Sequence, residues 1–499
     1  MILFSRTKVK SIVDSKQKKL WIGGQAVDGD AGVAPLVSIN PATGEVNHEV
    51  AAAGAAAADA AVRNADDAVR ASHWRGMPPA QRARILARIA DGMEARGDEL
   101  ARLQMLENGK VWRECQAQVK SAAATFRYYA GVCETTGSEV TPARGDYLSM
   151  AVYEPYGVVA AITPWNSPMT MEAQKVAPAL AAGNAMVLKP SEITPSTGLL
   201  LGQIALEAGL PPGILNVLPG TGQQVGAALV AHPKVRLVSF TGGTESGRRI
   251  SEVAARKLMP VALELGGKSP HIVFNDASVD AAVAALAGGI FEGSGQSCVS
   301  GSRAFVQRGV YQQVVDKLVA TARALRVDLP DAPGAEMGPL ATFAHRDRVA
   351  SMVENARSAG ADILTGGARP DSAQLERGAY YQPTVIAGID NRADIAQQEI
   401  FGPVLCVIPF DDEEDLIAQA NDSAFGLASG IWTSDYQRAW RVARALEAGT
   451  VWINTYKQLS ISTPFGGFKE SGIGREKGIT GMRLYQQPKG IYFGMGPTA

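Results

Sequence analysis

The sequence predicts an α/β fold built in two successive units, and three observations support this prediction. Residues 56–136 place apolar side chains at steps of three and four, which is typical of amphipathic helices. From residue 156 to residue 264, short apolar runs alternate with helical segments, which indicates a parallel sheet with helices on both faces. The same alternation starts again after Gly266 and Gly267, which indicates a second α/β unit.

Each element follows from its local pattern. The helical region opens with "ADAAVRNADDAVRA" and "PPAQRARILARIADGMEARGDEL", and two strand-like runs follow, "DYLSMAVYEP" and "YGVVAAITP". The first unit then has the strands "NAMVLK", "GILNVLP", "VRLVSF" and "PVALEL", separated by the helices "STGLLLGQIALEAG", "GQQVGAALVA" and "TESGRRISEVAARK". The second unit has the strands "HIVF", "RAFVQ", "VLCVIPF" and "AGTVWIN", with the helices "SVDAAVAALAGGIF", "VYQQVVDKLVATARAL" and "EEDLIAQAN".

Composition narrows the class of function. A chain of 499 residues has room for about two to four domains. Its 48 basic and 49 acidic side chains nearly cancel, so neither a nucleic-acid partner nor a membrane partner is expected. The four cysteines and five histidines show no metal-binding spacing, so no metal is expected. The opening "MILFSRTKVKSIVDSKQKK" lacks a signal-peptide core, which points to the cytoplasm.

Cys298 is the first candidate catalytic residue. It lies in "GSGQSCVSGSR", where small and polar neighbours leave room for a ligand to approach the sulfur. A reactive thiol needs a positive or dipolar environment that lowers its pKa, and this setting is expected around Cys298. The alternative is an inert small residue in a turn, and composition alone leaves both open.

Two further candidates stand at the ends of predicted strands. Glu264 closes the apolar run of "PVALELGGKSP", where burial would raise its pKa and make it a usable base; the alternative is a structural ion pair. Asn166 lies between two prolines in "TPWNSP", where a rigid amide donor could serve an oxyanion hole; the alternative is a helix cap.

The sequence also offers weak signals for a phosphate-bearing cofactor. "VSFTGGTESG" reads as strand, glycine turn and helix, an arrangement that can hold an anion at the helix N-terminus, although the GxGxxG fingerprint is absent. In "LKPSE", Lys189 could bind a hydroxyl or a phosphate and Glu192 a ribose diol. The alternative for both is a solvated charge at a strand end.

Seven motifs together resemble the NAD(P)-dependent aldehyde dehydrogenase superfamily. In order they are "PWN", "KPSE", "FTGGTESG", "ELGGKSP", "GQSC", "EIFGPV" and "PFGGFKESGIGRE", and the resemblance runs from "LWIGG" to the C-terminus. It implies the aldehyde dehydrogenase fold: a Rossmann-like cofactor domain, an α/β catalytic domain and a small β oligomerisation unit. The implied boundaries are 1–137 with 155–266, then 267–470, and then 138–154 with 485–499.

The resemblance implies a catalytic set. Cys298 would attack the aldehyde, while Asn166 and the Cys298 N–H hold the oxyanion, and Glu264 would activate water to hydrolyse the thioester. Lys175 and Glu476 match positions that relay protons to this base. Glu264 also argues against the CoA-acylating branch, whose members lack it. That branch, and a silent structural or binding relative, are the alternative functions.

The resemblance further implies NAD as cofactor, with NADP as an alternative. Glu192 favours NAD, and many relatives have Ser where this chain has Gly243, so one contact to phosphate is missing. The implied cofactor-binding residues are Ile162, Thr163, Pro164, Trp165, Lys189, Ser191, Glu192, Gly222, Gly226, Phe240, Thr241, Gly242, Gly243, Thr244, Leu265, Gly266, Glu399 and Phe401.

The implied partner molecules are a small aldehyde and further copies of the chain, in a homodimer or homotetramer. The identity of the aldehyde stays open. Ser167 and Leu459 stand where many relatives carry aromatic residues, so an aromatic box for small aliphatic aldehydes is expected to be depleted. Gln174 stands where succinic semialdehyde enzymes carry Arg, which disfavours that substrate.

Overall fold

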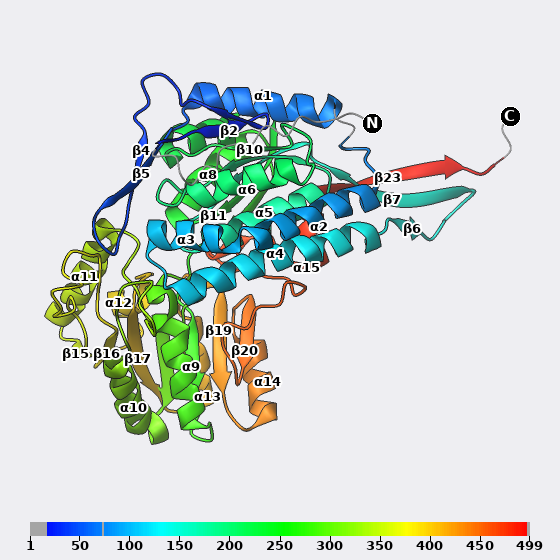
Figure 1. Cartoon of the computed structure of the whole chain (residues 1–499). Helices are drawn as coiled ribbons and strands as arrows, with labels where there is room; N and C mark the ends of the chain where they lie inside the picture. Colours follow the sequence, from blue (N-terminus) through cyan, green and yellow to red (C-terminus); the bar gives the residue numbers. More distant parts are fainter. Residues whose placement is uncertain (1–16, 72–73, 497–499) are drawn as a thin grey trace.

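The computed structural model describes residues 17–71 and 74–496, which form two α/β lobes and a projecting three-stranded sheet (Figure 1). Both predicted α/β units are confirmed. The opening segment, which was expected to lack a signal-peptide core, consists mainly of residues 1–16, and these lie outside the described residues. Residues 497–499 of the predicted oligomerisation unit also lie outside them.

The first lobe, at the top of Figure 1, is built on an eight-stranded sheet. Its strands in spatial order are β22 (Gly472–Ile473), β12 (Val261–Glu264), β11 (Val235–Thr241), β8 (Val158–Ile162), β9 (Ala185–Lys189), β10 (Leu215–Val217), β2 (Leu20–Ile22) and β3 (Gln25–Val27). The five central strands, from β12 to β10, are parallel and largely buried. Near-continuous apolar runs such as "VVAAI" suit strands covered on both faces.

Helices cover both faces of this sheet. The predicted helical region forms α1 (Ala55–Ala71), α2 (Pro79–Ala95), α3 (Gly97–Asn108) and α4 (Trp112–Thr135). The crossover helices are α5 (Pro168–Ala181), α6 (Ser196–Glu207), α7 (Ala227–Ala231) and α8 (Thr244–Arg256), and Gly222–Gly226 before α7 is a π-helix. A small sheet of β1 (Gln17–Lys18), β5 (Val46–Val50) and β4 (Leu36–Ile39) lies beside this lobe, and α15 (Gly478–Arg483) packs against α5.

The second lobe, below the first in Figure 1, holds a seven-stranded sheet. Its order is β15 (Asp362–Thr365), β16 (Thr384–Ala387), β17 (Val404–Phe410), β14 (Arg303–Gln307), β13 (Pro270–Val273), β19 (Ala428–Trp432) and β20 (Thr450–Ile453). Its helices are α9 (Val279–Phe291), α10 (Tyr311–Ala324), α11 (Phe343–Ser358), α12 (Asp394–Gln397), α13 (Glu413–Asn421) and α14 (Tyr436–Ala445). A short pair, β18 (Phe425–Gly426) and β21 (Phe468–Lys469), connects to its edge.

The third sheet extends away from both lobes on the right of Figure 1. It contains β6 (Glu139–Thr141), β7 (Tyr147–Pro155) and β23 (Gln486–Gly494), all antiparallel, with β7 in the centre. The C-terminal strand therefore returns to pair with a hairpin more than 300 residues earlier in the chain. Within residues 17–71 and 74–496, no helix is long and apolar enough to cross a membrane.

Candidate active site

The strands of the first sheet bring the predicted cofactor residues to one edge. The register aligns Thr241 with Glu264, Phe240 with Ile162, and Ile162 with Lys189, so the carboxyl ends of β12, β11, β8 and β9 stand side by side. The chain order reverses between β8 and β11, because β9 and β10 follow on one side and β12 on the other. Ligands of open α/β sheets bind outside such a switch point.

The loops at this switch point leave open space and polar groups without a hydrogen-bond partner, both of which a ligand could use. Gly243 is the N-cap of α8, and a Cβ placed on it would meet no atom within 4 Å. The buried hydroxyls of Thr163 and Thr241 have no hydrogen-bond partner within the described part of the chain. An open helix N-terminus next to unpaired hydroxyls fits the polar, anionic portion of a dinucleotide.

Glycines shape the same edge. Gly242 must lack a side chain because a Cβ there would overlap the Phe240 ring, and its N–H donates to the Glu264 carbonyl oxygen at 3.1 Å. Gly226 lies on the π-helix, where a Cβ would come within 4.0 Å of the Ile162 side chain, whereas Gly222 faces open space.

Lys189 and Glu192 form an ion pair beside this edge. The buried Lys189 Nζ lies 2.8 Å from Glu192 Oε2, and the glutamate side chain is 46% exposed. Partial burial opposes the charge of Glu192, but the ammonium group outweighs it and lowers the pKa of the carboxyl. Ser191 between them is buried, and its hydroxyl accepts a hydrogen bond from the Ile193 N–H.

Cys298 sits on a strained connection between α9 and β14. Three successive residues, Gly293, Ser294 and Gly295, have φ values of 65°, 57° and 71°, in the left-handed region. A Cβ on Gly295 would overlap the Gly402 backbone, and one on Gly267 would overlap the Cys298 carbonyl oxygen. Small residues are therefore required by the close approach of three backbone segments, and Cys298 itself remains half-buried.

The expected electrostatic setting of Cys298 is wrong. Burial, together with the nearby carboxyl groups of Glu399 and Glu264, raises the pKa of Cys298 to about 12. The backbone N–H groups of Cys298 and Val299 favour the thiolate but do not outweigh these effects. The protein alone therefore keeps the thiol protonated at neutral pH, and a base has to remove its proton.

Glu264 has the properties expected of a base. It ends β12, is 5% exposed, and its Oε2 has no hydrogen-bond partner within the described residues. Burial, followed by repulsion from Glu476, raises its pKa well above the ordinary value, as predicted. No residue of the described ranges forms an ion pair with it, so the structural alternative for Glu264 is not supported.

A buried polar network connects Lys175 on α5 to Glu476 near the C-terminus. Lys175 Nζ lies 2.6 Å from Glu476 Oε1 and donates to Ser239 Oγ at 3.0 Å. Gln174 Nε2 donates to the other oxygen of Glu476 at 2.8 Å, and the Tyr485 hydroxyl also donates to Ser239. The roles of Ser239, Gln174 and Tyr485 in this network could not be found from sequence, because they only meet in three dimensions.

Asn166 contacts the loop that carries Cys298. Its Nδ2 donates to the Gln296 carbonyl oxygen at 2.8 Å, which uses one of its two amide hydrogens. The N-cap of α5 is Ser167, without a side-chain capping bond, so the capping alternative for Asn166 is not supported. The amide is thus held beside the cysteine loop with one hydrogen left to donate.

Glu399 and Phe401 approach the site from the second lobe. Glu399 Oε1 accepts a hydrogen bond from the Gly267 N–H at 2.9 Å, and a Cβ on Gly266 would lie 2.7 Å from Oε2. Phe401 has a φ of 59° and packs edge-on against Trp165, with ring centroids 5.3 Å apart. Leu265 packs against Gly247 on α8, behind the edge.

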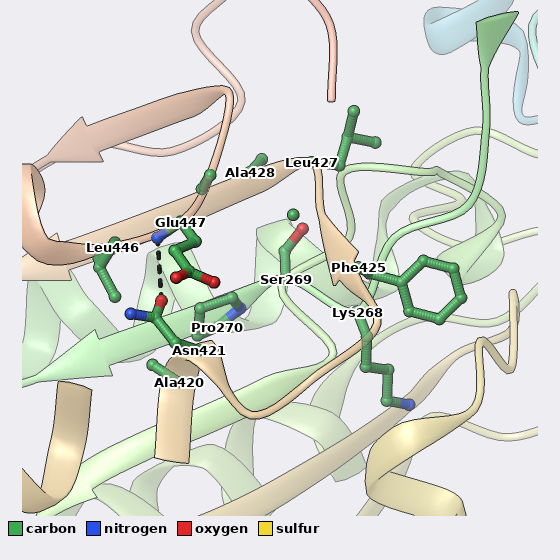
Figure 2. Close-up of a pocket in the computed structure, with 12 residues that line it drawn as sticks. Lys268, Ser269, Pro270, Ala420, Asn421, Phe425, Leu427, Ala428, Leu446 and Glu447 are labelled. Carbon is green, nitrogen blue, oxygen red and sulfur yellow. Dashed lines mark hydrogen bonds between the residues drawn. The ribbon is translucent and has the colours of Figure 1, made fainter. Parts of the chain in front are cut away.

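A separate small cavity lies between residues 268–270, 420–421, 425–428 and 446–448 (Figure 2). Its volume of about 10 Å³ holds about one water molecule. Figure 2 shows Asn421 accepting a hydrogen bond from the Glu447 N–H on one side of it, at 2.9 Å, while the Lys268 side chain runs away from this bond. The cavity is too small for an aldehyde or a dinucleotide, so it is distinct from the candidate site.

Comparison with known proteins decides the family. Residues 27–491 match the aldehyde dehydrogenase family. The chain belongs to this family. A betaine aldehyde dehydrogenase from Cereibacter sphaeroides is 42% identical to this family member over 478 residues, which cover 96% of the chain and 97% of that protein. A phenylacetaldehyde dehydrogenase from Pseudomonas fluorescens is 42% identical over 481 residues, 95% of each chain.

Solved structures of other aldehyde dehydrogenases have the same fold. The NAD⁺ complex of an aldehyde dehydrogenase from Bacillus cereus has a TM-score of 0.95 and 38% identity, and the match covers 99% of both chains. A betaine aldehyde dehydrogenase from Staphylococcus aureus in complex with NAD⁺ has a TM-score of 0.94 and 37% identity over 97% of this chain and 96% of that one. The family and the fold predicted from the sequence are confirmed.

Proposed function

We propose that this aldehyde dehydrogenase oxidises an aldehyde to the carboxylic acid with NAD, through a thiohemiacetal and then a thioester on Cys298. The observation that carries the proposal is the meeting of Cys298, Glu264 and Asn166 from three separate segments, next to the switch-point edge. Relatives crystallised with NAD⁺ support the cofactor, and one of them, a betaine aldehyde dehydrogenase, carries a BME-modified cysteine.

The reaction divides into acylation and hydrolysis. Solvent takes the proton of the Cys298 thiol, and the deprotonated sulfur then adds to the carbonyl carbon. The carbonyl oxygen becomes an oxyanion that accepts hydrogen bonds from the Asn166 amide and the Cys298 N–H. Bound NAD supplies the acceptor for the hydride that then leaves the carbonyl carbon. Glu264 takes a proton from water as the water adds to the thioester; the C–S bond breaks, the acid leaves, and the sulfur regains a proton.

Lys175 and Glu476 would return the proton of Glu264 to solvent. Their buried pair lies close enough to Glu264 for Glu476 to raise, and Lys175 to lower, the pKa of the base. For the cofactor we propose the predicted set, with Lys189 and Glu192 at the adenosine ribose, Gly243 and Thr244 near the phosphates, and Glu399 and Phe401 at the nicotinamide end.

Formation of NADH tests the function directly. The purified protein is incubated with NAD and benzaldehyde, with and without CoA, and NADH and the acid are measured. NADH and free acid in equal amounts, independent of CoA, support the proposal. Strict dependence on CoA would assign the acylating branch instead, and no NADH with a broad aldehyde panel would favour a silent relative.

The expected cofactor preference is NAD over NADP. A carboxylate at Glu192 accepts hydrogen bonds from ribose hydroxyls but repels a 2′-phosphate, by about 4 kcal/mol for unit charges ~4 Å apart at an effective dielectric of ~20. Solvent and the Lys189 ammonium group reduce this repulsion between Glu192 and the 2′-phosphate, so kcat/KM should favour NAD by roughly one to two orders of magnitude. Glu192→Gln should reduce the ratio of kcat/KM for NAD to that for NADP, whereas Glu252→Gln, on the exposed side of α8, should leave this ratio unchanged. Equal kcat/KM values of the wild type for NAD and NADP would contradict the role assigned to Glu192.

We also propose that the third sheet, within residues 138–154 and 485–499, joins copies of the chain into a homodimer or homotetramer. Its large apolar side chains are exposed in the single chain: Val140 is 72% exposed, Tyr492 70% and Met495 69%. Residues 1–137 with 155–266 would then bind the cofactor, and 267–470 would carry Cys298.

Light scattering after gel filtration checks the assembly. Wild type should elute as a dimer or a tetramer, and Val140→Asp combined with Tyr492→Asp should shift it to a smaller species, because charge placed in an apolar interface is costly. Val46→Asp on β5, a residue that is 62% exposed, serves as the matched control. A monomeric wild type would contradict this proposal.

The proposed location is the cytoplasm. All four cysteines are free thiols, and Cys115, Cys133 and Cys406 are buried. A protein that depends on a cysteine thiol works best where thiols are kept reduced. Fractionation of the source cells, followed by immunodetection, would check this location.

A further inference from the structure

Two lysine side chains flank Cys298 from the segments that cover it. Lys457 belongs to the loop after β20, and its Nζ donates to the Gly288 carbonyl oxygen in the last turns of α9, at 3.2 Å. Lys477 precedes α15, and its Nζ lies 5.2 Å from the centre of the Phe465 ring. Phe465 belongs to the apolar cluster against which Cys298 packs.

The backbone holds both lysines in fixed positions. Lys457 has a φ of 55° and Lys477 a φ of 62°, a conformation that non-glycine residues seldom adopt. Tyr456 is fixed next to Lys457, because its ring stacks on His271 at 4.1 Å and its hydroxyl donates to the Val299 carbonyl oxygen, one residue after Cys298. Strained positions of this kind concentrate at functional sites.

Neither ammonium group has a carboxylate partner. Among residues 17–71 and 74–496, no carboxylate oxygen lies within 4.0 Å of the Nζ of Lys457 or Lys477. Both side chains are half-buried. Burial lowers the pKa of Lys457 to about 8, and Glu292 and Glu114 oppose this shift more than the Cys298 sulfur does. Burial also lowers the pKa of Lys477, against the opposing effect of Glu476 and then of the Cys298 sulfur and Glu264. Cations in such a setting are normally paired, and neither lysine forms an ion pair within the described residues, so each can still accept an anionic partner.

The neighbouring carboxyl groups are already engaged or solvated. Glu476 pairs with Lys175, and Glu399 accepts from the Gly267 N–H. Glu114 accepts a hydrogen bond from the Gly293 N–H, and Glu292 is exposed to solvent. Glu264 also acts on Lys477, but its raised pKa favours the uncharged carboxyl. Lys457 and Lys477 therefore remain cations that no described carboxylate pairs directly.

We propose that the substrate of this enzyme is an aldehyde that carries a carboxylate, and that Lys457 and Lys477 bind this carboxylate. The inference rests on the proposed function and adds the class of substrate.

The test compares aldehydes that differ only in charge. Adipic semialdehyde and terephthalaldehydic acid are each compared with their neutral carboxamide, and betaine aldehyde supplies a cationic substrate. Wild type should favour each acid over its amide by about tenfold in kcat/KM, as expected for hydrogen bonds to a charged group. The difference should appear mainly in KM.

Substitutions then assign the preference to the two lysines. Lys457→Met and Lys477→Met should each lower the acid-to-amide ratio, and the double variant should bring it to about one. Lys457→Arg should keep most of the ratio, which separates charge from loss of folding. Lys317→Met, at an exposed lysine paired with Asp280 on the outside of the second lobe, is the control and should leave the ratio unchanged.

Two results would overturn the inference in different ways. Activity with the amides that equals or exceeds activity with the acids, or a ratio that stays unchanged in the double variant, would remove the carboxylate assignment and leave the proposed function intact. Absence of NADH with every aldehyde, charged or neutral, would overturn both.

Discussion

Cys298→Ala should abolish NADH formation while NAD binding stays at the wild-type level. In the proposed mechanism the sulfur forms the covalent bond to the aldehyde, and alanine removes the atom that makes this bond. A loss of more than about a thousandfold in kcat is expected, as for other enzymes deprived of their nucleophile. Steady-state kinetics measures the loss, and fluorescence titration measures cofactor binding.

The other cysteines supply matched controls. Cys115, Cys133 and Cys406 are buried, and each sulfur contacts a backbone carbonyl oxygen rather than the site. Alanine at any of them should cost stability but leave most of kcat. Retention of more than a few per cent of kcat in Cys298→Ala would remove the assignment.

Glu264→Gln should slow hydrolysis of the thioester more than its formation. The amide keeps the volume of the side chain but cannot take a proton from water, so a burst of NADH should precede a slow steady state. Because burial raises the pKa of Glu264, wild-type kcat should increase as pH rises through that pKa, and the variant should lose this increase. Rapid-mixing absorbance measurements resolve the two phases.

Glu172→Gln is the matched control for this experiment. Glu172 is also fully buried, with a pKa raised to about 8 by burial, but its Oε1 accepts from the Thr197 hydroxyl on α6, away from Cys298. It should show no burst. If Glu264→Gln slowed acylation and turnover equally, with no burst, Glu264 would be reassigned to thiol activation or to structure.

The elements that place the cofactor edge could be predicted from sequence because each carries its own local signal. "VVAAI", "AMVLK" and "VRLVSFT" are short apolar runs between turn residues, and they form β8, β9 and β11. The short strands before residue 50, and β22, escaped prediction. Runs of two to five residues have too little periodicity, and their pairing depends on distant segments.

The pKa shifts at the site could be predicted only where the residue's own segment of the chain determines them. The raised pKa of Glu264 follows from its apolar strand, and the structure confirms it. The expected setting of Cys298 was wrong because segments distant in sequence bury it, and because the carboxyl groups of Glu399 and Glu264 reach it from other parts of the chain. The contact between Lys175 and Ser239 was likewise not predicted, since the two residues are distant in sequence, whereas Glu476 was named with Lys175 through the family resemblance.

The pairing of β22 with β12 has a consequence for how the protein is made. Glu476 lies 301 positions after Lys175, and β22, just before it, closes the edge of the first sheet beside Glu264. On the ribosome, at roughly 5–20 residues per second, the first lobe therefore waits with an open strand edge and a buried lysine lacking its partner. A buried charge without its partner costs about 3–5 kcal/mol. The nascent chain should consequently need protection by chaperones until β22 and Glu476 emerge, and it can gain activity only after that.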